Sequence, residues 1–209
     1  ISYYGSIAKS GVSYVTVGAT ALSVSGHSTS RGLRCHSTNY LKGFEKLNKE
    51  IKKHANSCIQ VFHAGQQINP EHTGFPPVGS SEYVVPDIGV NARVLSIDEI
   101  ENIEEEFVSG ISRLFDVGFD FVEIHAAHGY LLNGFISPHM NRRKDKYGGS
   151  EENRFRILKN IINGLEKLDH NYLSRLNLRL SASDFISGGL SENDLSSWKT
   201  QLSLEKLAI

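Results

Sequence analysis

The chain has 209 residues, of which 39% are hydrophobic and 22% are charged, and these proportions fit one folded domain spanning residues 1–209. Its 22 Lys and Arg against 23 Asp and Glu leave a net charge of −1, so no general field would attract nucleic acid or an anionic membrane. We therefore expect small molecules as ligands, and neither nucleic acid nor a membrane as a partner.

Cysteine usage favours a reducing compartment. Only Cys35 and Cys58 occur, and neither lies in a CxxC pattern or in a Cys/His cluster with metal-ligand spacing. There is no run of about 18 apolar residues and no basic leader followed by an apolar core, so we expect a cytoplasmic location. The chain opens on Ile1 rather than on Met, which leads us to expect that it was cut from something longer.

Four short apolar runs rich in β-branched residues predict buried strands. Near-continuous apolar character with little alternation is typical of parallel strands that are covered on both faces. The four predicted strands are residues 13–17, 58–62, 119–124 and 176–180.

The segments between these strands have helical periodicity, over residues 40–51, 97–114 and 155–165. The second begins with a capping box of Ser96 and Glu99 and is closed by Gly118, and a fourth helix is expected from Ser191 onwards. Strict alternation of strand and helix predicts a parallel α/β fold, which is either a doubly wound open sheet or a (β/α)8 barrel. Residues 63–95 form a connection long enough to be functional or disordered.

Polar side chains gather where the predicted strands end, and in both candidate folds ligands bind at that end of the sheet. His125 closes the third predicted strand and His128 follows three residues later, so both imidazoles could donate to one carbonyl oxygen and polarise it. Tyr130 could supply a proton from its phenol. A packing role for the histidines stays open beside this catalytic interpretation.

Metal binding is the other chemistry to consider for a histidine pair. Glu123 is the nearby carboxylate, and we place it on the opposite side of the strand, so no ligand set is complete and we predict no metal. Arg179 in the fourth strand fits two interpretations equally, a buried salt bridge or contact with a cofactor.

The segment GFDFVEIHAAHGYLL at residues 118–132 resembles the fourth-strand signature of the old yellow enzyme family of flavin oxidoreductases. The similarity continues in register over residues 135–154. Residues 17–26, 59–65 and 179–184 resemble the second, third and fifth strand segments of the same family. The resemblance is closest to its bacterial branch with two histidines in the site, which includes NADPH dehydrogenases of the ene-reductase type and 2,4-dienoyl-CoA reductases.

This resemblance implies an incomplete TIM (β/α)8 barrel with strands two to five of eight, and FMN at its carboxyl-terminal mouth. It implies that NAD(P)H reduces the flavin, which then reduces the activated C=C bond of an enone or enoyl substrate. Carried over residue by residue, it assigns His125 and His128 to the substrate carbonyl oxygen and Tyr130 to proton donation. The residues that it assigns to the flavin are Ala19, Gln60 and Arg179, the last beside the N1 and O2 edge.

Three positions depart from the family pattern. Gly18 stands where an acidic residue is common, Gln66 where Arg normally closes the His-Ala-Gly motif, and His27 where Arg often follows the Gly.

A full barrel takes about 250 residues and commonly holds a cofactor phosphate on the loops after strands seven and eight. We therefore expect a fragment of an active oxidoreductase that lacks this phosphate anchor; the other possibility is one half of a barrel that a complementing chain or an oligomer completes. The alternatives are a catalytically inactive binding or assembly module and a metal-dependent hydrolase.

Overall fold

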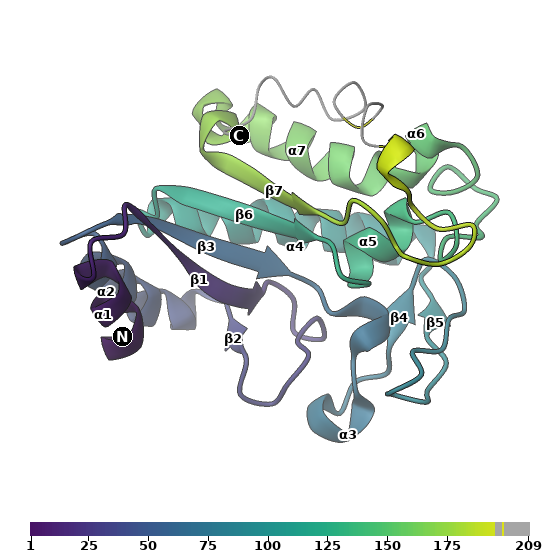
Figure 1. Cartoon of the computed structure of the whole chain (residues 1–209), viewed down its shortest axis with the longest axis horizontal. Helices are drawn as coiled ribbons and strands as arrows, with labels where there is room; N and C mark the ends of the chain where they lie inside the picture. Colours follow the sequence, from purple (N-terminus) through teal and green to yellow (C-terminus); the bar gives the residue numbers. More distant parts are fainter. Residues whose placement is uncertain (195–197, 199–209) are drawn as a thin grey trace.

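A parallel sheet forms the centre of the structure. The computed structural model describes residues 1–194 and Trp198, and in it five strands lie in the order β2-β1-β3-β6-β7, each parallel to its neighbour (Figure 1). The strands are β1 (Tyr14–Ala21), β2 (Leu33–Arg34), β3 (Asn56–Phe62), β6 (Phe121–Ala126) and β7 (Leu176–Leu180). The four strands predicted from the apolar runs are confirmed as β1, β3, β6 and β7.

The principal helices are α1 (Ser2–Lys9), α2 (Leu41–Ile51), α4 (Ile97–Asp116) and α7 (Arg156–Leu168). The three predicted helices are confirmed as α2, α4 and α7. Ser96 and Glu99 form the expected capping box, and Gly118, at φ 97°, follows the end of α4. Of the expected fourth helix, the structure describes a 3₁₀ turn, η4 (Glu192–Asp194), and Trp198; the rest lies outside the described residues.

The two faces of the sheet differ in burial. Strand side chains of one parity pack with α2, α4 and α7 into one hydrophobic cluster, while those of the other parity are largely exposed or half-buried. Consecutive long strands are neighbours and these helices cover one face, which is the winding of a barrel rather than of a doubly wound sheet. The buried strand residues include Val15, Val17, Ile59, Val61, Val122, Ile124 and Leu176.

A bulge interrupts β1 near the carboxyl end of the sheet. Val17 pairs with Ile59 and Thr20 with Val61, so β1 contains one residue more than β3 over this stretch. The predicted strand ended at Val17, whereas the bulge lets the strand continue to Ala21.

The long connection after β3 is folded. It contains η2 (Gly65–Gln67), α3 (Pro70–Thr73) and a parallel pair of two-residue strands, β4 (Val78–Gly79) and β5 (Arg93–Val94). It packs on α5 (Leu131–Ile136), which follows β6, and the Ser80 hydroxyl donates to the Gly134 carbonyl at 2.7 Å. The remaining short elements are η1 (Thr38–Tyr40), α6 (Glu151–Arg154) and η3 (His170–Arg175).

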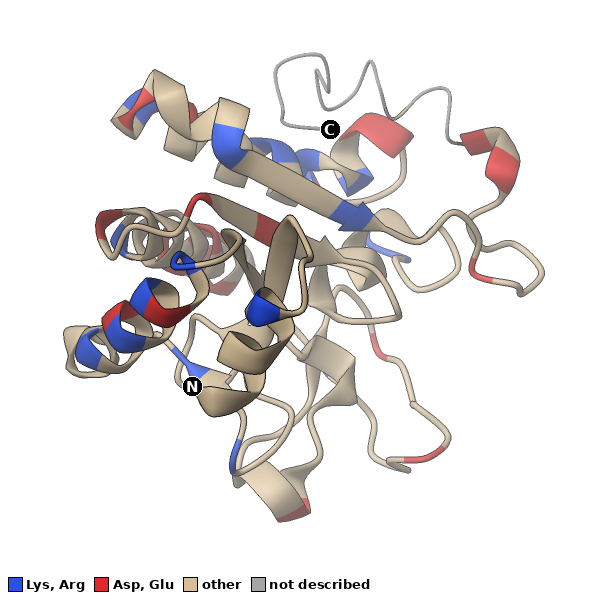
Figure 2. Ribbon diagram, turned by 60° about the vertical axis from the view of Figure 1, so that its left-hand side comes forward, with Lys and Arg blue, Asp and Glu red and all other residues tan. Residues whose placement is uncertain are grey.

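The charged residues are spread over the surface. Figure 2 shows basic and acidic residues interspersed along the helices, in keeping with the net charge of −1. Among the described residues, no helix has the length and apolar character needed to cross a membrane.

Candidate active site

The open face of the sheet carries polar side chains in rows, because the strands pair in register. Gln60 on β3 pairs with Glu123 on β6, and Glu123 pairs with Asn177 on β7. The Gln60 Nε2 donates to Glu123 Oε1 at 2.5 Å, and the Asn177 Nδ2 donates to the Tyr14 hydroxyl at 2.6 Å. These side chains therefore converge from β1, β3, β6 and β7 on the same face.

This register corrects the position that we predicted for Glu123. Side chains on a strand alternate with a period of two, so Glu123 and His125 point to the same face. The carboxylate lies one row below the histidine and is engaged by Gln60. Within residues 1–194, no group of three or more His, Cys, Asp or Glu side chains could hold a metal ion.

The structure brings His125, His128 and Tyr130 together at the carboxyl end of β6. The ring centroids of the two histidines are 4.9 Å apart, and the His125 and Tyr130 centroids are 5.0 Å apart. Tyr130 also packs edge-on against Phe62 of β3, at 5.2 Å between centroids. His125 is buried, Tyr130 is half-buried and His128 is exposed, so the cluster extends from the sheet to the surface.

His125 is poised to be neutral. Burial, with the nearby positive groups of His128 and Arg179, lowers the pKa of His125 to about 4. Its Nδ1 is buried and has no hydrogen-bond partner among the described residues. A neutral imidazole has one donor and one acceptor nitrogen, so this ring can offer a hydrogen bond without carrying a charge.

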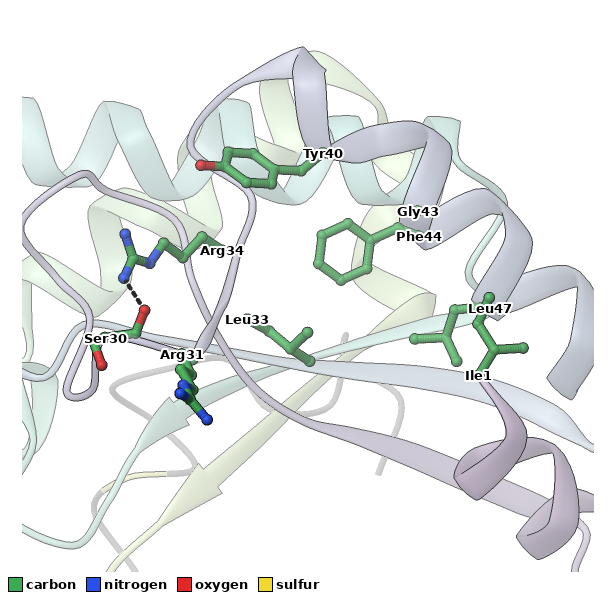
Figure 3. A pocket seen from close by; sticks show the side chains of 10 residues that line it. Ile1, Ser30, Arg31, Leu33, Arg34, Tyr40, Gly43, Phe44 and Leu47 are labelled. Atoms are coloured by element: carbon green, nitrogen blue, oxygen red, sulfur yellow. Dashed lines mark hydrogen bonds between the residues drawn. The ribbon is translucent and has the colours of Figure 1, made fainter.

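Two pockets bear on the choice of site. One of about 510 Å³ adjoins His128; it is lined by His128, Gly129, Asn133, Met140 and residues 180–185. Another, of about 580 Å³, lies between α2 and the segment around β2, and neither histidine nor Tyr130 lines it (Figure 3). Its wall is largely apolar, with Phe44 and Leu47 from α2 facing Leu33, and we do not assign the chemistry to it.

Comparison with known proteins identifies a family for this chain. The model of the NADH:flavin oxidoreductase / NADH oxidase family matches residues 1–206. The chain belongs to this family. It is 35% identical over 191 residues to an NADPH dehydrogenase of Bacillus subtilis, an alignment that covers 91% of this chain and 55% of the relative. The chain thus spans about half the length of the curated relatives that it matches.

Solved structures share the fold. A 2-naphthoyl-CoA reductase superposes with a TM-score of 0.92 at 26% identity, covering 99% of this chain and 33% of the other. The old yellow enzyme homologue from Zymomonas mobilis superposes with a TM-score of 0.86 at 25% identity, covering 99% of this chain and 61% of the other. The predicted architecture, part of a TIM barrel, is confirmed.

FMN, the cofactor of this family, can be tested against the residues at the mouth. Ala19 lies in the bulge of β1, and Gln60, tied to Glu123 through its amide nitrogen, keeps its carbonyl oxygen as an acceptor for an imide N–H. Arg179 on β7 is exposed, and among the described residues no hydrogen bond or ion pair engages its guanidinium. These groups fit the polar edge of a flavin ring. The phosphate site that is usual in such barrels lies on the loops after strands seven and eight, which are later strands than β1, β3, β6 and β7.

Four residues that received no role from the sequence contact the segment between His125 and Tyr130. Gln66, Gln67, Asn133 and Ser181 all hydrogen-bond to its backbone. Two of them had a signal in the sequence, Gln66 as a departure from the family pattern and Ser181 as a polar residue at the end of a predicted strand.

Proposed function

We propose that this chain forms the substrate-binding part of an FMN-dependent NAD(P)H oxidoreductase that reduces activated C=C bonds of α,β-unsaturated carbonyl compounds. The observation that carries the proposal is the cluster of His125, His128 and Tyr130 at the end of β6, beside a residue set that fits a flavin ring. The names of the relatives agree in class, since they include an NADPH dehydrogenase and a 2-naphthoyl-CoA reductase.

The histidines would act on the carbonyl group of the substrate. His125 is neutral at physiological pH because its pKa is about 4, so it donates a hydrogen bond to the carbonyl oxygen and keeps its proton. His128, with its ring centroid 4.9 Å from that of His125, can donate to the same oxygen. Two donors on one oxygen withdraw electron density from the conjugated double bond and stabilise the enolate-like charge, typically by a few kcal/mol for each donor.

Tyr130 would deliver the proton that completes the reduction. Its ring is held between His125 and Phe62, at 5.0 Å and 5.2 Å between centroids, which keeps the phenol ring beside His125. FMN, when bound, supplies the hydride that NAD(P)H has provided, and Tyr130 protonates the neighbouring carbon. Gln60 and Ala19 would orient the flavin ring, and Arg179 would favour negative charge at its N1 and O2 edge.

An absorption experiment tests this function. The purified chain is mixed with FMN, freed of excess flavin, and titrated without oxygen, first with NADPH and then with cyclohexenone. We expect flavin bands that bleach with NADPH and return with cyclohexenone. In the Tyr130→Phe protein the return should slow by about 100-fold or more, while bleaching stays unchanged.

A matched control uses a tyrosine far from the site. Tyr172 stacks on Phe115 at 4.6 Å between centroids. In the Tyr172→Phe protein the flavin bands should return with cyclohexenone at the wild-type rate. The alternative, a catalytically inactive binding or assembly module, has one observation in its favour, since Arg179 is exposed on an open side of the sheet. A folded but colourless protein after FMN treatment would support that alternative.

A further inference from the structure

The segment that joins His125 to α5 contains a strained turn. The backbone φ is 58° at His128 and 72° at Gly129, and the Tyr130 N–H donates to the Ala127 carbonyl at 3.2 Å, as in a type I′ turn. Positive φ suits glycine and is disfavoured for a residue with a Cβ such as His128. Such a conformation persists only where the surroundings fix it. We call residues 127–130 the histidine turn.

Both amide groups of the two left-handed residues are held by acceptors from other elements. The Ser181 hydroxyl, just after β7, accepts from the His128 N–H at 2.9 Å. The Asn133 Oδ1, in α5, accepts from the Gly129 N–H at 2.6 Å. The N–H side of the histidine turn is therefore fixed at two points.

Both carbonyl groups are held by neighbouring glutamines of η2. The Gln67 Nε2 donates to the His128 carbonyl at 2.5 Å, and the Gln66 Nε2 donates to the Gly129 carbonyl at 2.6 Å. With the two acceptors above, every backbone N–H and C=O of the left-handed pair has a side-chain partner. Asn133 is close to the turn in sequence, whereas Gln66, Gln67 and Ser181 are more than 50 residues away, so the turn is determined largely by distant residues.

Gln66 is itself fixed by its surroundings. Its side chain is 2% exposed, and a Cβ at Gly134 would lie 2.6 Å from its Nε2, so only glycine leaves room for the amide. Gly65, at φ 61°, brings η2 close to α5, because a Cβ there would lie 2.7 Å from the Cα of Leu131. These close approaches place both glutamine amides at the turn.

We propose that Gln66 and Gln67 are positioning residues for the reaction. By holding the carbonyls of Gly129 and His128, they fix the left-handed turn that sets the His128 imidazole and the Tyr130 phenol against His125. The part that concerns catalysis rests on the proposed function, whereas the part that concerns the turn can be tested without any cofactor.

Hydrogen exchange of the chain alone tests the structural part. Gln66→Met and Gln67→Met keep side-chain volume and remove the donor, and Asn171→Ala, in η3 at the opposite end of β7, is the control. We expect exchange at the amides of residues 128–131 to accelerate on the order of tenfold in both Met variants, while β3 and β6 keep their protection. Unchanged exchange at the turn, or equal acceleration over the whole sheet, would overturn the proposal.

A double-mutant cycle in flavin-loaded protein tests the catalytic part. Gln67→Met should raise the KM for cyclohexenone by about fivefold to tenfold and leave NADPH bleaching unchanged. In a His128→Asn background the same substitution should have little further effect, because the histidine that it positions is gone. An equal loss in both backgrounds would refute positioning through His128. If wild type fails to turn over while exchange at the turn still accelerates in the Met variants, the proposed function fails and the account of the turn stands.

Discussion

His125 on β6 and Arg179 on β7 are direct partners in the parallel ladder. The arginine is thereby placed one strand away from the buried imidazole, on the face where the flavin is proposed to bind. Its positive charge adds to the effects of burial and of His128, which together lower the pKa of His125 to about 4. The cation proposed to stabilise negative charge on the flavin thus also contributes to the lowered pKa of His125, after burial and His128.

The first prediction concerns this coupling. In Arg179→Gln the pKa of His125 should rise from about 4 but stay below 6.5, because burial, the largest cause of the shift, remains. Imidazole titration by ¹⁵N NMR, with His125 assigned by its own substitution, measures the change. Arg31→Gln, at an exposed position near β2, is the control. An unaltered His125 titration in the Arg179 variant would show that the guanidinium does not act on the ring.

Features that depend on residues close together in the sequence could be predicted, whereas contacts between residues far apart in the sequence could not. The order of strands and helices followed from local periodicity, and β7 has the predicted bounds. The position given to Glu123 was wrong although alternation along one strand determines it, since Glu123 and His125 are two residues apart. The clamp on the histidine turn was not predictable from a single sequence, because Gln67 and His128 are 61 residues apart and meet only in the folded chain.

The second prediction concerns stability in acid. His63 is 2% exposed and accepts a hydrogen bond from the Gly65 N–H through Nδ1, and burial, with a contribution from His27, lowers its pKa to about 4. Between pH 6.5 and 4 the unfolded chain binds a proton that the folded chain does not. The free energy of unfolding should therefore fall as the pH is lowered through this window, by about 2 kcal/mol from this residue at pH 5.

Urea unfolding at pH 7 and pH 5 measures that loss. His63→Gln should reduce the difference between the two pH values, because the substituted amide does not titrate. His54→Gln, at an exposed position, is the control and should keep the wild-type difference. If His63→Gln and His54→Gln show the same pH dependence, burial of His63 is not its source.

The third prediction has the opposite sign. Glu104 on α4 is 9% exposed, and burial raises its pKa to about 7, partly offset by the Asn160 amide, which donates to both of its oxygens. Between pH 4.5 and 7 the folded chain retains a proton that the unfolded chain releases. The carboxyl group therefore reduces stability progressively as the pH rises through this window. This window overlaps that of His63, so the opposite contributions of the two groups to the free energy of unfolding should partly cancel between about pH 4.5 and 6.5.

Thermal unfolding of Glu104→Gln checks this. The substitution should raise Tm at pH 8, by the equivalent of about 1–3 kcal/mol, and should change it little at pH 5, where the carboxyl group is protonated. Glu105→Gln, an exposed neighbour on the same helix, should leave Tm nearly unchanged at both pH values. If the Tm of the Glu104→Gln protein at pH 8 is no higher than that of the wild type, the buried charge of Glu104 does not reduce stability.

The last prediction separates backbone conformation from close packing at η2. Gly65 and Gly74 have similar φ values, 61° and 75°, but a Cβ at Gly65 would lie 2.7 Å from the Cα of Leu131, whereas at Gly74 nothing lies within 4 Å. Gly74→Ala should lose about 1 kcal/mol of unfolding free energy, from the left-handed conformation alone. Gly65→Ala should lose about 2 kcal/mol more, because η2 and α5 must move apart.

The same pair of variants should also differ in the conformation of the histidine turn. If η2 shifts, Gln66 and Gln67 lose their hold on the histidine turn, so exchange at the amides of residues 128–131 should accelerate in Gly65→Ala and not in Gly74→Ala. Equal losses of stability in the two variants would mean that the close approach to Leu131 relaxes without strain. In that case the glutamine clamp would not depend on glycine at position 65, and the distance between η2 and α5 would be adjustable.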